Sequence, residues 1–316
     1  MICGGIDLGG TKIEARLFDG PDCATVKARR IATPRDSYAN LLDALLEQID
    51  WLTELAGAPN MPIGIAFPGI VTPDTGMVFA SNICASGQTL AGDLGAKLRR
   101  TFVTINDCMA FALSESTGGA ASDAHVVMGL VLGTGVGGGI CRGGALDARL
   151  GGLAVEIGHV PLSADALTRH DLPRLPCGCG RRGCTETYVS GTGIANIAEL
   201  KTGQRLQAPE LVGTHEDILD IWADIAGDCL MTIHLMLAPD CIVLGGGLSN
   251  LPNVSERLNL AMKHHAFGDM VLPQLVQAQH GDSSGARGAA LLARSAPATN
   301  HRPDQQGGVP RHFPTR

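Results

Sequence analysis

The sequence predicts an α/β protein of two lobes, each built on the same strand-and-turn motif. Strand-like runs alternate with helical runs along the chain, which is typical of sheets covered by helices. The chain has 316 residues, too many for one ordinary core and sufficient for two. Residues 5–11 resemble residues 129–135, and each segment is a strand that runs into a glycine turn. This weak repeat predicts a duplicated lobe.

The first half of the chain predicts a sheet with one long helix. The first apolar strand ends at Gly9-Gly10, and a second buried strand, 62–67, is closed by Pro68-Gly69. Between these two strands, leucine and isoleucine recur at helical spacing from Leu41 to Leu55, and Gly57 ends the helix. In this half the predicted strands are 2–8, 13–18, 62–67 and 102–105, and the predicted helices are 41–55 and 108–116.

The second half repeats the pattern and adds a long helix. That helix covers 218–237 and ends at Pro239, while the predicted strands are 126–132, 139–141 and 241–244. Residues 117–123 are the expected boundary, so we expect lobes at 1–118 and 119–283. A helix over 284–295 is expected to return to the first lobe. Residues 296–316 are polar, with several prolines and glycines, and are expected to be disordered.

Composition excludes several classes of function. The chain is 45% hydrophobic and 17% charged, with a formal net charge of −7, and it has no basic stripe of the kind that nucleic-acid binders carry. It has no apolar run long enough to cross a bilayer and no signal-like segment at its start. We therefore expect a cytoplasmic protein without a nucleic-acid or membrane partner. Ten cysteines agree with this, since seven lie scattered among apolar neighbours.

Two glycine turns carry the first functional signal. Asp7-Leu8-Gly9-Gly10-Thr11-Lys12 adds a carboxylate, a hydroxyl and an ammonium group to one turn, and residues 133–139 are richer still in glycine. Such turns let backbone N–H groups point at a phosphate. Either turn alone is as consistent with an ordinary hairpin, but the two together favour a nucleotide clamp. Neither fits the P-loop pattern or the dinucleotide fingerprint.

Asn106-Asp107 lies between a predicted strand and a predicted helix. In one interpretation Asp107 is only a helix N-cap, a common role for Asp. In the other it is a carboxylate at a strand-to-helix corner between the lobes, where it accepts the proton of an attacking hydroxyl. The residues alone favour the cap.

A cysteine cluster is the most specific signal. Cys177, Cys179 and Cys184 share a glycine-rich knuckle, and in a reducing compartment such clustering indicates a metal. Zn²⁺ is commonly held by three Cys and one His, so His159 and His170 are the candidates for the fourth ligand. Four protein ligands would close the site, which makes a structural zinc the expectation.

Glu156 and Glu186 lie beside these proposed zinc ligands in the sequence. Isolated glutamates are usually solvated surface residues. The alternative is a pair of carboxylates, oriented by the knuckle, that accept hydrogen bonds from sugar hydroxyls.

Taken together, these motifs resemble the ROK family of sugar kinases and repressors. The resemblance rests on Asp7-x-Gly9-Gly10-Thr11-Lys12, Asn106-Asp107, Glu156-x-Gly158-His159 and the 177–186 knuckle, and it spans residues 2 to about 294. It implies an actin-like, hexokinase-like (ribonuclease H-like) fold with the active site in the cleft between the lobes. It also implies Mg-ATP and a sugar as small-molecule partners, a structural zinc, and a homodimer as the family's usual assembly.

The resemblance also implies a role for each motif. Asp107 would be the catalytic base, and His159 would complete the zinc ligands Cys177, Cys179 and Cys184. The sugar would be bound by Gly69, Asn82, Asn106, Asp107, Glu156, His159 and Glu186. ATP would be held by Asp7, Gly9, Gly10, Thr11, Lys12, Gly133, Thr134, Gly135, Gly137, Gly138 and Gly139, with Gly245, Gly246 and Gly247 near the nucleoside.

Within the family, residues 33–38, 206–210 and 280–282 resemble bacterial N-acetylglucosamine kinases. Ala85 stands where many glucose-phosphorylating relatives carry Trp, and a smaller side chain there would leave space for an acetamido group. Val155 departs from the family's usual Gly, and its branched Cβ restricts the backbone next to Glu156.

The resemblance therefore implies phosphorylation of the 6-hydroxyl of N-acetylglucosamine in amino sugar salvage. A glucokinase, or a kinase of another hexose or of N-acetylmannosamine, is the alternative substrate assignment. A sugar-responsive repressor would need a DNA-binding domain ahead of the turn that begins at Asp7, so we expect a kinase instead. Asp107 argues against a third alternative, a non-catalytic sugar sensor.

Overall fold

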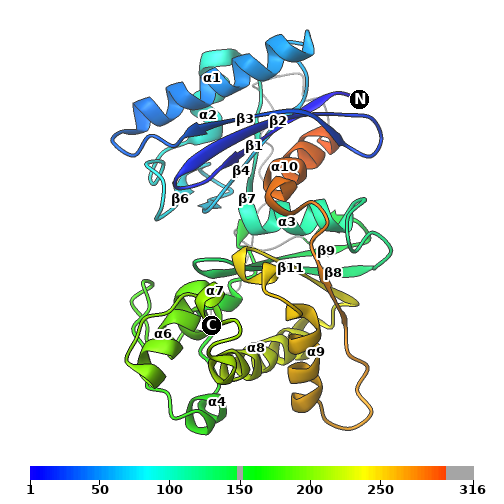
Figure 1. The fold of residues 1–316 in the computed structure, drawn as a ribbon. Helices are drawn as coiled ribbons and strands as arrows, with labels where there is room; N and C mark the ends of the chain where they lie inside the picture. Colours follow the sequence, from blue (N-terminus) through cyan, green and yellow to red (C-terminus); the bar gives the residue numbers. More distant parts are fainter. Residues whose placement is uncertain (148–151, 297–316) are drawn as a thin grey trace, which may run out of the picture.

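The structure is a computed structural model and describes residues 1–147 and 152–296 (Figure 1). Two five-stranded sheets form its framework, with the strand orders β3-β2-β1-β4-β7 and β10-β9-β8-β11-β12. In each sheet the first strand pairs antiparallel with the second and parallel with the fourth. The shared topology confirms the predicted duplicated α/β fold. The strands are β1 (Cys3–Leu8), β2 (Lys12–Asp19), β3 (Ala24–Ala32), β4 (Ile63–Phe67), β7 (Val103–Asn106), β8 (Val126–Leu132), β9 (Val136–Arg142), β10 (Ala145–Leu146), β11 (Cys241–Gly245) and β12 (Gln274–Gln277).

Helices α1 (Tyr38–Ala56) and α2 (Leu90–Leu98) pack against the first sheet, and their leucines share one core with β1, β2 and β4. The Ser37 hydroxyl caps the start of α1, and Gly57 ends the helix with a left-handed φ of 59°. The predicted 41–55 helix is therefore confirmed and extended at its N-terminus. A two-stranded ribbon of β5 (Ile70–Val71) and β6 (Val78–Phe79) follows β4.

Most of the remaining helices gather beyond the second sheet, in the lower part of Figure 1. The longest is α8 (Glu216–Leu237), which ends just before Pro239 as predicted, and its Trp222 is fully buried in the core of this part. The others are α4 (Ala164–Arg169), α5 (Glu186–Val189), α6 (Gly191–Thr202), α7 (Ala208–Leu211) and α9 (Val254–His265).

Two helices pack between the sheets, α3 (Asp107–Ser116) and α10 (Ser284–Ser295) (Figure 1). They are close-packed, because a Cβ at Gly288 would lie 1.9 Å from the Ala110 carbonyl oxygen. On its other side α10 lies against β1 and β4, where Gly5 and Gly64 leave no room for a side chain. The 284–295 segment therefore packs against the first sheet.

The predicted disordered tail lies outside the described residues apart from Ala296, so it stays a prediction. Among the residues that the structure describes, no helix combines the length and apolar character needed to span a membrane.

Candidate active site and metal cluster

The first glycine turn connects β1 to β2 and is held from three sides. The Gly9 N–H donates to the Lys12 carbonyl oxygen at 2.9 Å, and the Thr33 hydroxyl donates to the Gly9 carbonyl at 2.7 Å. A Cβ at Gly10 would lie 3.1 Å from the Asn82 carbonyl oxygen. Thr11 and Lys12 are exposed. The turn is thus fixed in shape, and Asn82 lies directly against it.

The second turn connects β8 to β9 and meets the third glycine segment. The Gly191 N–H donates to the Gly133 carbonyl oxygen at 2.7 Å, and the Thr192 hydroxyl donates to the Thr134 carbonyl at 2.9 Å. Gly246 has a φ of 81°, and a Cβ there would lie 2.5 Å from the Leu132 carbonyl oxygen. A Cβ at Gly133 or at Gly247 would meet nothing within 4 Å. Space therefore remains beside these ends of β8 and β11, although the Gly133 N–H itself donates to the Gly135 carbonyl oxygen at 3.0 Å.

Packing explains four of the glycines that the sequence assigned to ATP. Gly137, Gly138 and Gly139 lie inside β9 rather than in its turn. A Cβ at Gly137 would lie 2.5 Å from the Cys108 sulfur, one at Gly138 would lie 2.3 Å from Met128, and one at Gly139 would lie 2.5 Å from the Cys108 carbonyl. A Cβ at Gly245 would lie 2.5 Å from the Phe111 ring. These glycines let the second sheet approach α3 and the neighbouring strand.

Asn106 and Asp107 have different structural roles at the start of α3. Asn106, not Asp107, is the N-cap of α3, since its side-chain oxygen accepts from the Cys108 N–H at 2.9 Å. Its side-chain amide donates to the Gly69 carbonyl oxygen at 3.1 Å. The interpretation of Asp107 as the cap is therefore wrong. Asp107 begins the helix, and its carboxylate also accepts from the Cys108 N–H, at 2.8 Å.

Burial raises the pKa of the Asp107 carboxyl, although its hydrogen bonds with Cys108 act in the opposite direction. The pKa of Asp7 rises to about 7 because the side chain is buried and because the charges of Asp107 and Glu14 lie nearby. Lys12 offsets only part of this increase. Asp7 at the end of β1 and Asp107 at the start of α3 therefore repel each other when both are charged, and a bound cation would relieve this repulsion.

The structure brings together the three predicted cysteines and one of the two candidate histidines in a cluster that could hold a metal ion. The ligand atoms of His159, Cys177, Cys179 and Cys184 all lie within 4.8 Å of one another. The Cys179 and Cys184 sulfurs are 3.6 Å apart, and the Cys177 sulfur is 3.7 Å from His159 Nδ1. Sulfur ligands at about 2.3 Å from a tetrahedral zinc lie about 3.8 Å apart, so the spacing fits zinc. His170 instead pairs with Asp224, at 2.6 Å.

Glu186 joins this cluster to the second glycine turn. Its carboxylate accepts from the Cys177 thiol at 2.9 Å and lies 3.4 Å from His159 Nδ1. On its other side, a Cβ at Gly135 would lie 2.9 Å from a Glu186 oxygen. The knuckle therefore fixes one carboxylate beside the open turn.

Glu156 precedes the short helical turn Ile157–His159, so one turn of backbone carries both Glu156 and His159. The neighbouring Val155 is buried and bridges to Gly138 with an N–H to O distance of 2.9 Å. Its φ is not positive, so the branched side chain causes no backbone strain. The expected disturbance of Glu156 by Val155 has no support in this geometry.

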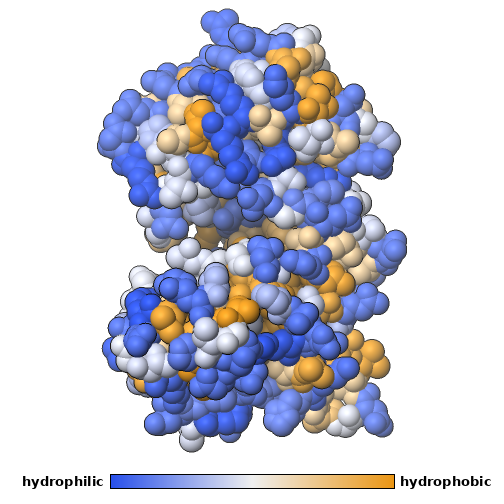
Figure 2. Space-filling model, viewed as in Figure 1, coloured by the Kyte–Doolittle hydropathy of each residue, from blue (hydrophilic) through white to orange (hydrophobic). Residues whose placement is uncertain are grey.

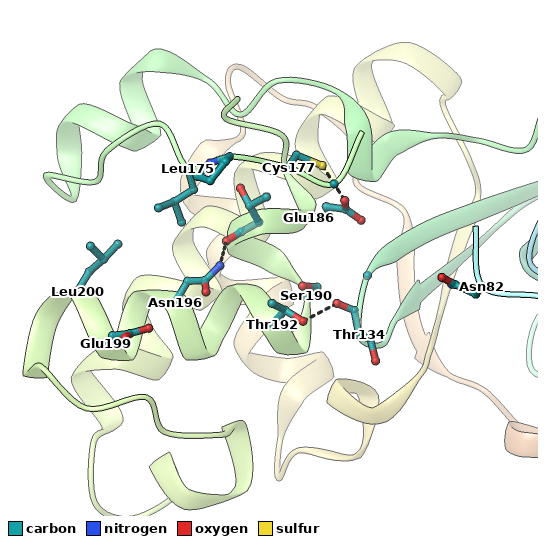
Figure 3. A pocket seen from close by; sticks show the side chains of 14 residues that line it. Asn82, Thr134, Leu175, Cys177, Glu186, Ser190, Thr192, Asn196, Glu199 and Leu200 are labelled. Atoms are coloured by element: carbon teal, nitrogen blue, oxygen red, sulfur yellow. Dashed lines mark hydrogen bonds between the residues drawn. The ribbon is translucent and has the colours of Figure 1, made fainter. Parts of the chain in front are cut away.

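A cavity of about 800 Å³ opens at this point (Figure 3). Its lining includes five of the predicted residues, namely Asn82, Thr134, Gly135, Cys177 and Glu186. Figure 2 shows a hollow between the upper and lower parts of this largely hydrophilic face. The lining does not include Gly69, Asn106, Asp107, Glu156 or His159.

The sequence interpretation missed the rest of the lining. Thr192, Asn196 and Glu199 lie on one face of α6, and the Asn196 amide donates to the Thr187 carbonyl oxygen at 2.9 Å (Figure 3). Their spacing of four and three residues is a helical signal that would have found them. The others are Leu175, Pro176, Gly178, Thr187, Ser190 and Leu200.

The ROK family model matches residues 3–296 of the chain. An N-acetylgalactosamine kinase from Shewanella sp. (strain ANA-3) is 40% identical over 306 residues, which cover 93% of this chain and 97% of that protein. An N-acetyl-D-glucosamine kinase from Escherichia coli O7:K1 (strain IAI39 / ExPEC) is 38% identical over 298 residues, covering 91% and 98%.

Two solved structures have the same fold. A ROK hexokinase from Thermus thermophilus superposes with a TM-score of 0.81 at 28% identity, covering 93% of this chain and 98% of that one. A ROK family glucokinase from Streptomyces griseus, solved with glucose and AMPPNP, superposes with a TM-score of 0.77 at 26% identity, covering 94% and 100%. The predicted hexokinase-like fold is confirmed.

Proposed function

Because the chain belongs to the ROK family, we propose that it is a sugar kinase that transfers the γ-phosphate of ATP to the 6-hydroxyl of N-acetyl-D-glucosamine. The observation that carries the proposal is Asp107, a half-buried carboxyl group with a raised pKa at a strand-to-helix corner. A general base works best when its pKa approaches the working pH.

In the proposed reaction Asp107 accepts the proton of the 6-hydroxyl as that oxygen attacks the γ-phosphorus, and ADP leaves on the opposite side. Asn106 orients this corner through its bonds to Cys108 and Gly69. The space beside Gly133 and Gly247 would receive the phosphates. When bound, Mg²⁺ supplies charge neutralisation to the β- and γ-phosphates, and Asp7 is the residue of this chain best suited to approach it.

We also propose one structural zinc held by His159, Cys177, Cys179 and Cys184. All four ligand positions come from the protein, so no position remains for a reacting water. The zinc would fix the knuckle and therefore Glu186, which follows the ligand Cys184 by two residues. Glu186 and Glu156 would then bind sugar hydroxyls.

Mg-ATP binding is expected to release a proton from Asp7. With a pKa of about 7, Asp7 is close to half protonated at pH 7 in the ligand-free protein. A cation favours the carboxylate, so binding should release up to about half a proton per chain. Titration calorimetry with a preformed magnesium complex of a non-hydrolysable ATP analogue, in buffers of different ionisation enthalpy, measures this. Asp7→Asn should abolish the release; equal release by both proteins would contradict the assignment.

The same shift has a consequence for stability without ligand. A carboxyl group whose pKa rises on folding, here from 3.8 to about 7, favours the fold below pH 3.8 and loses this contribution as pH rises through about 7. Between these pH values the free energy of unfolding of Asp7→Asn should therefore fall less steeply than that of the wild type.

The preference for an N-acetylated sugar rests on the two curated relatives. Ala85 gives no further support, because it is fully buried in the core of the first lobe rather than part of the cavity lining. The Shewanella relative makes N-acetylgalactosamine the second candidate, which differs only in the configuration of its 4-hydroxyl.

The test is an ADP-coupled assay with N-acetylglucosamine, N-acetylgalactosamine, N-acetylmannosamine, glucose and fructose. We expect the highest kcat/KM for N-acetylglucosamine. A site that hydrogen-bonds the amide can reject glucose by up to about 10⁴–10⁵-fold. A higher value for N-acetylgalactosamine would select the second candidate, and glucose at or above both would remove the N-acetyl assignment.

A further inference from the structure

Glu115, near the end of α3, is a fully buried carboxylate with four hydrogen-bond donors around it. One oxygen accepts from the His280 N–H at 3.0 Å and from the Ser284 hydroxyl at 2.7 Å. The other accepts from the Gln279 N–H at 3.0 Å and the Ala120 N–H at 3.1 Å. Both oxygens of this carboxylate are therefore held by the protein.

Three of the four donors come from the two segments that connect the sheets in the described chain, and the fourth, Ser284, begins α10. Residues 117–125 lead from α3 into β8, the first strand of the second sheet, and contribute Ala120. Residues 278–283 lead from β12 to α10, which packs on the first sheet, and contribute Gln279 and His280. The two segments also touch directly, since His280 Nε2 lies 3.0 Å from the Gly118 carbonyl oxygen. The Glu115 carboxylate thus joins both of the segments that connect the two sheets.

The charge of Glu115 matches this environment. Burial alone would raise its pKa, but the hydrogen bonds from Ser284 and the three backbone amides hold the pKa below its ordinary value. Backbone N–H groups can only donate, so a carboxylate satisfies all of them. An amide side chain has one accepting oxygen and would leave about two donors without a partner.

Glu115 is also connected to the candidate active site, through α10 on one side and α3 on the other. Ser284 begins α10, and a Cβ at the next residue, Gly285, would lie 2.7 Å from an Asp7 carboxylate oxygen. On the other side, α3 carries Glu115 near its end and Asp107 at its start. Glu115 therefore links α3, which carries Asp107, to α10, which packs against Asp7 of β1.

Glycines with positive φ flank the junction, Gly118 at 68° in one connecting segment and Gly281 at 50° in the other. Backbone rotation is least restricted at such residues. We propose that Glu115 is a positioning residue and the pivot about which the two lobes close on sugar and Mg-ATP. The proposal rests on the proposed kinase function, because closure matters only if both ligands bind between the lobes.

The test compares Glu115→Gln with Asp240→Asn. Asp240 is the control, because its carboxylate also accepts two backbone amides, from His125 at 3.1 Å and Val126 at 2.7 Å, but it is exposed and both amides lie at the entry to β8. The readout is the Kd of a non-hydrolysable ATP analogue with and without saturating N-acetylglucosamine. In the wild type the sugar should tighten nucleotide binding by about fivefold or more.

Glu115→Gln should reduce this coupling factor toward one and lower kcat by about 10- to 10²-fold, as expected when reacting groups are misplaced. Asp240→Asn should keep the coupling and kcat of the wild type. Ser284→Ala removes only one donor and should give an intermediate coupling factor. It replaces Glu115→Gln in the test if that variant does not fold. Wild-type coupling in the folded Glu115 and Ser284 variants would overturn the proposal, as would an equal loss in Asp240→Asn.

A second measurement distinguishes failure of the proposed kinase function from failure of the proposal for Glu115. If the wild type phosphorylates no sugar, the proposed function is wrong. Hydrogen exchange of the Ala120, Gln279 and His280 amides then tests the junction alone. Slow exchange that becomes fast in Glu115→Gln supports the junction, and fast exchange in the wild type overturns it.

Discussion

Asp107→Asn is expected to lower kcat by about 10²–10⁴-fold, the usual cost of losing a general base. The amide keeps the size of the carboxylate and can still accept from the Cys108 N–H, but it cannot take a proton. Asn106 remains the N-cap of α3, so the helix start is preserved. The free energy of unfolding should therefore stay close to that of the wild type. Steady-state kinetics and urea unfolding of the same preparation measure both.

Asp93→Asn is the matched control for this variant. Asp93 lies in the first turn of α2, as Asp107 does in α3, and accepts from the Tyr38 hydroxyl at 2.6 Å. Its replacement should leave kcat unchanged. The pH dependence of kcat/KM gives a second check, because the wild-type rate should rise with pH through the raised pKa of Asp107. A near-normal kcat in Asp107→Asn would show that another group is the base.

Cys179→Ala is expected to remove the zinc and to weaken sugar binding by about 10²-fold or more. Cys179 is exposed, so the change leaves no core cavity and its effects report on the metal. Structural zinc binding is worth about 10–16 kcal/mol in small domains, and its loss should disorder the 159–186 segment that carries Glu186. Nucleotide binding should suffer less, because the Gly133 turn is held by α6. Metal analysis and calorimetry with N-acetylglucosamine measure these effects.

Cys229→Ala controls for general destabilisation. Cys229 is buried in α8 and is not part of the cluster, so the variant should lose stability and keep one zinc per chain. Wild-type protein purified without added zinc but lacking stoichiometric metal would contradict the site, and so would unchanged zinc in Cys179→Ala.

The elements with strong apolar periodicity could be predicted from the sequence. In α1 the buried Leu41, Leu45, Ile49 and Leu52 recur at helical spacing, and β4 is buried at every residue. β3 was missed because most of its residues are exposed, so burial imposed no apolar alternation on them. β12 has the same difficulty, since exposed glutamines begin and end its four residues.

The local parts of the site could also be predicted, because its ligands lie close together in the sequence. Cys177, Cys179 and Cys184 are within eight residues and form one cluster with His159. The environment of Glu115 could not, since its donors come from residue 120 and from residues 279–284. Which residue caps α3 was also beyond the sequence, because Asn and Asp are equally good caps and only geometry distinguishes Asn106 from Asp107.

The most direct test of the central claim is phosphorus NMR of the products formed from ATP and N-acetylglucosamine. We expect one ADP for each sugar phosphate, with the phosphorus coupled to the two protons on C6. We also expect that ADP does not accumulate when the sugar is omitted. ADP formed without any sugar phosphate, or a phosphate on a ring hydroxyl, would contradict the assignment of this site as a sugar 6-kinase.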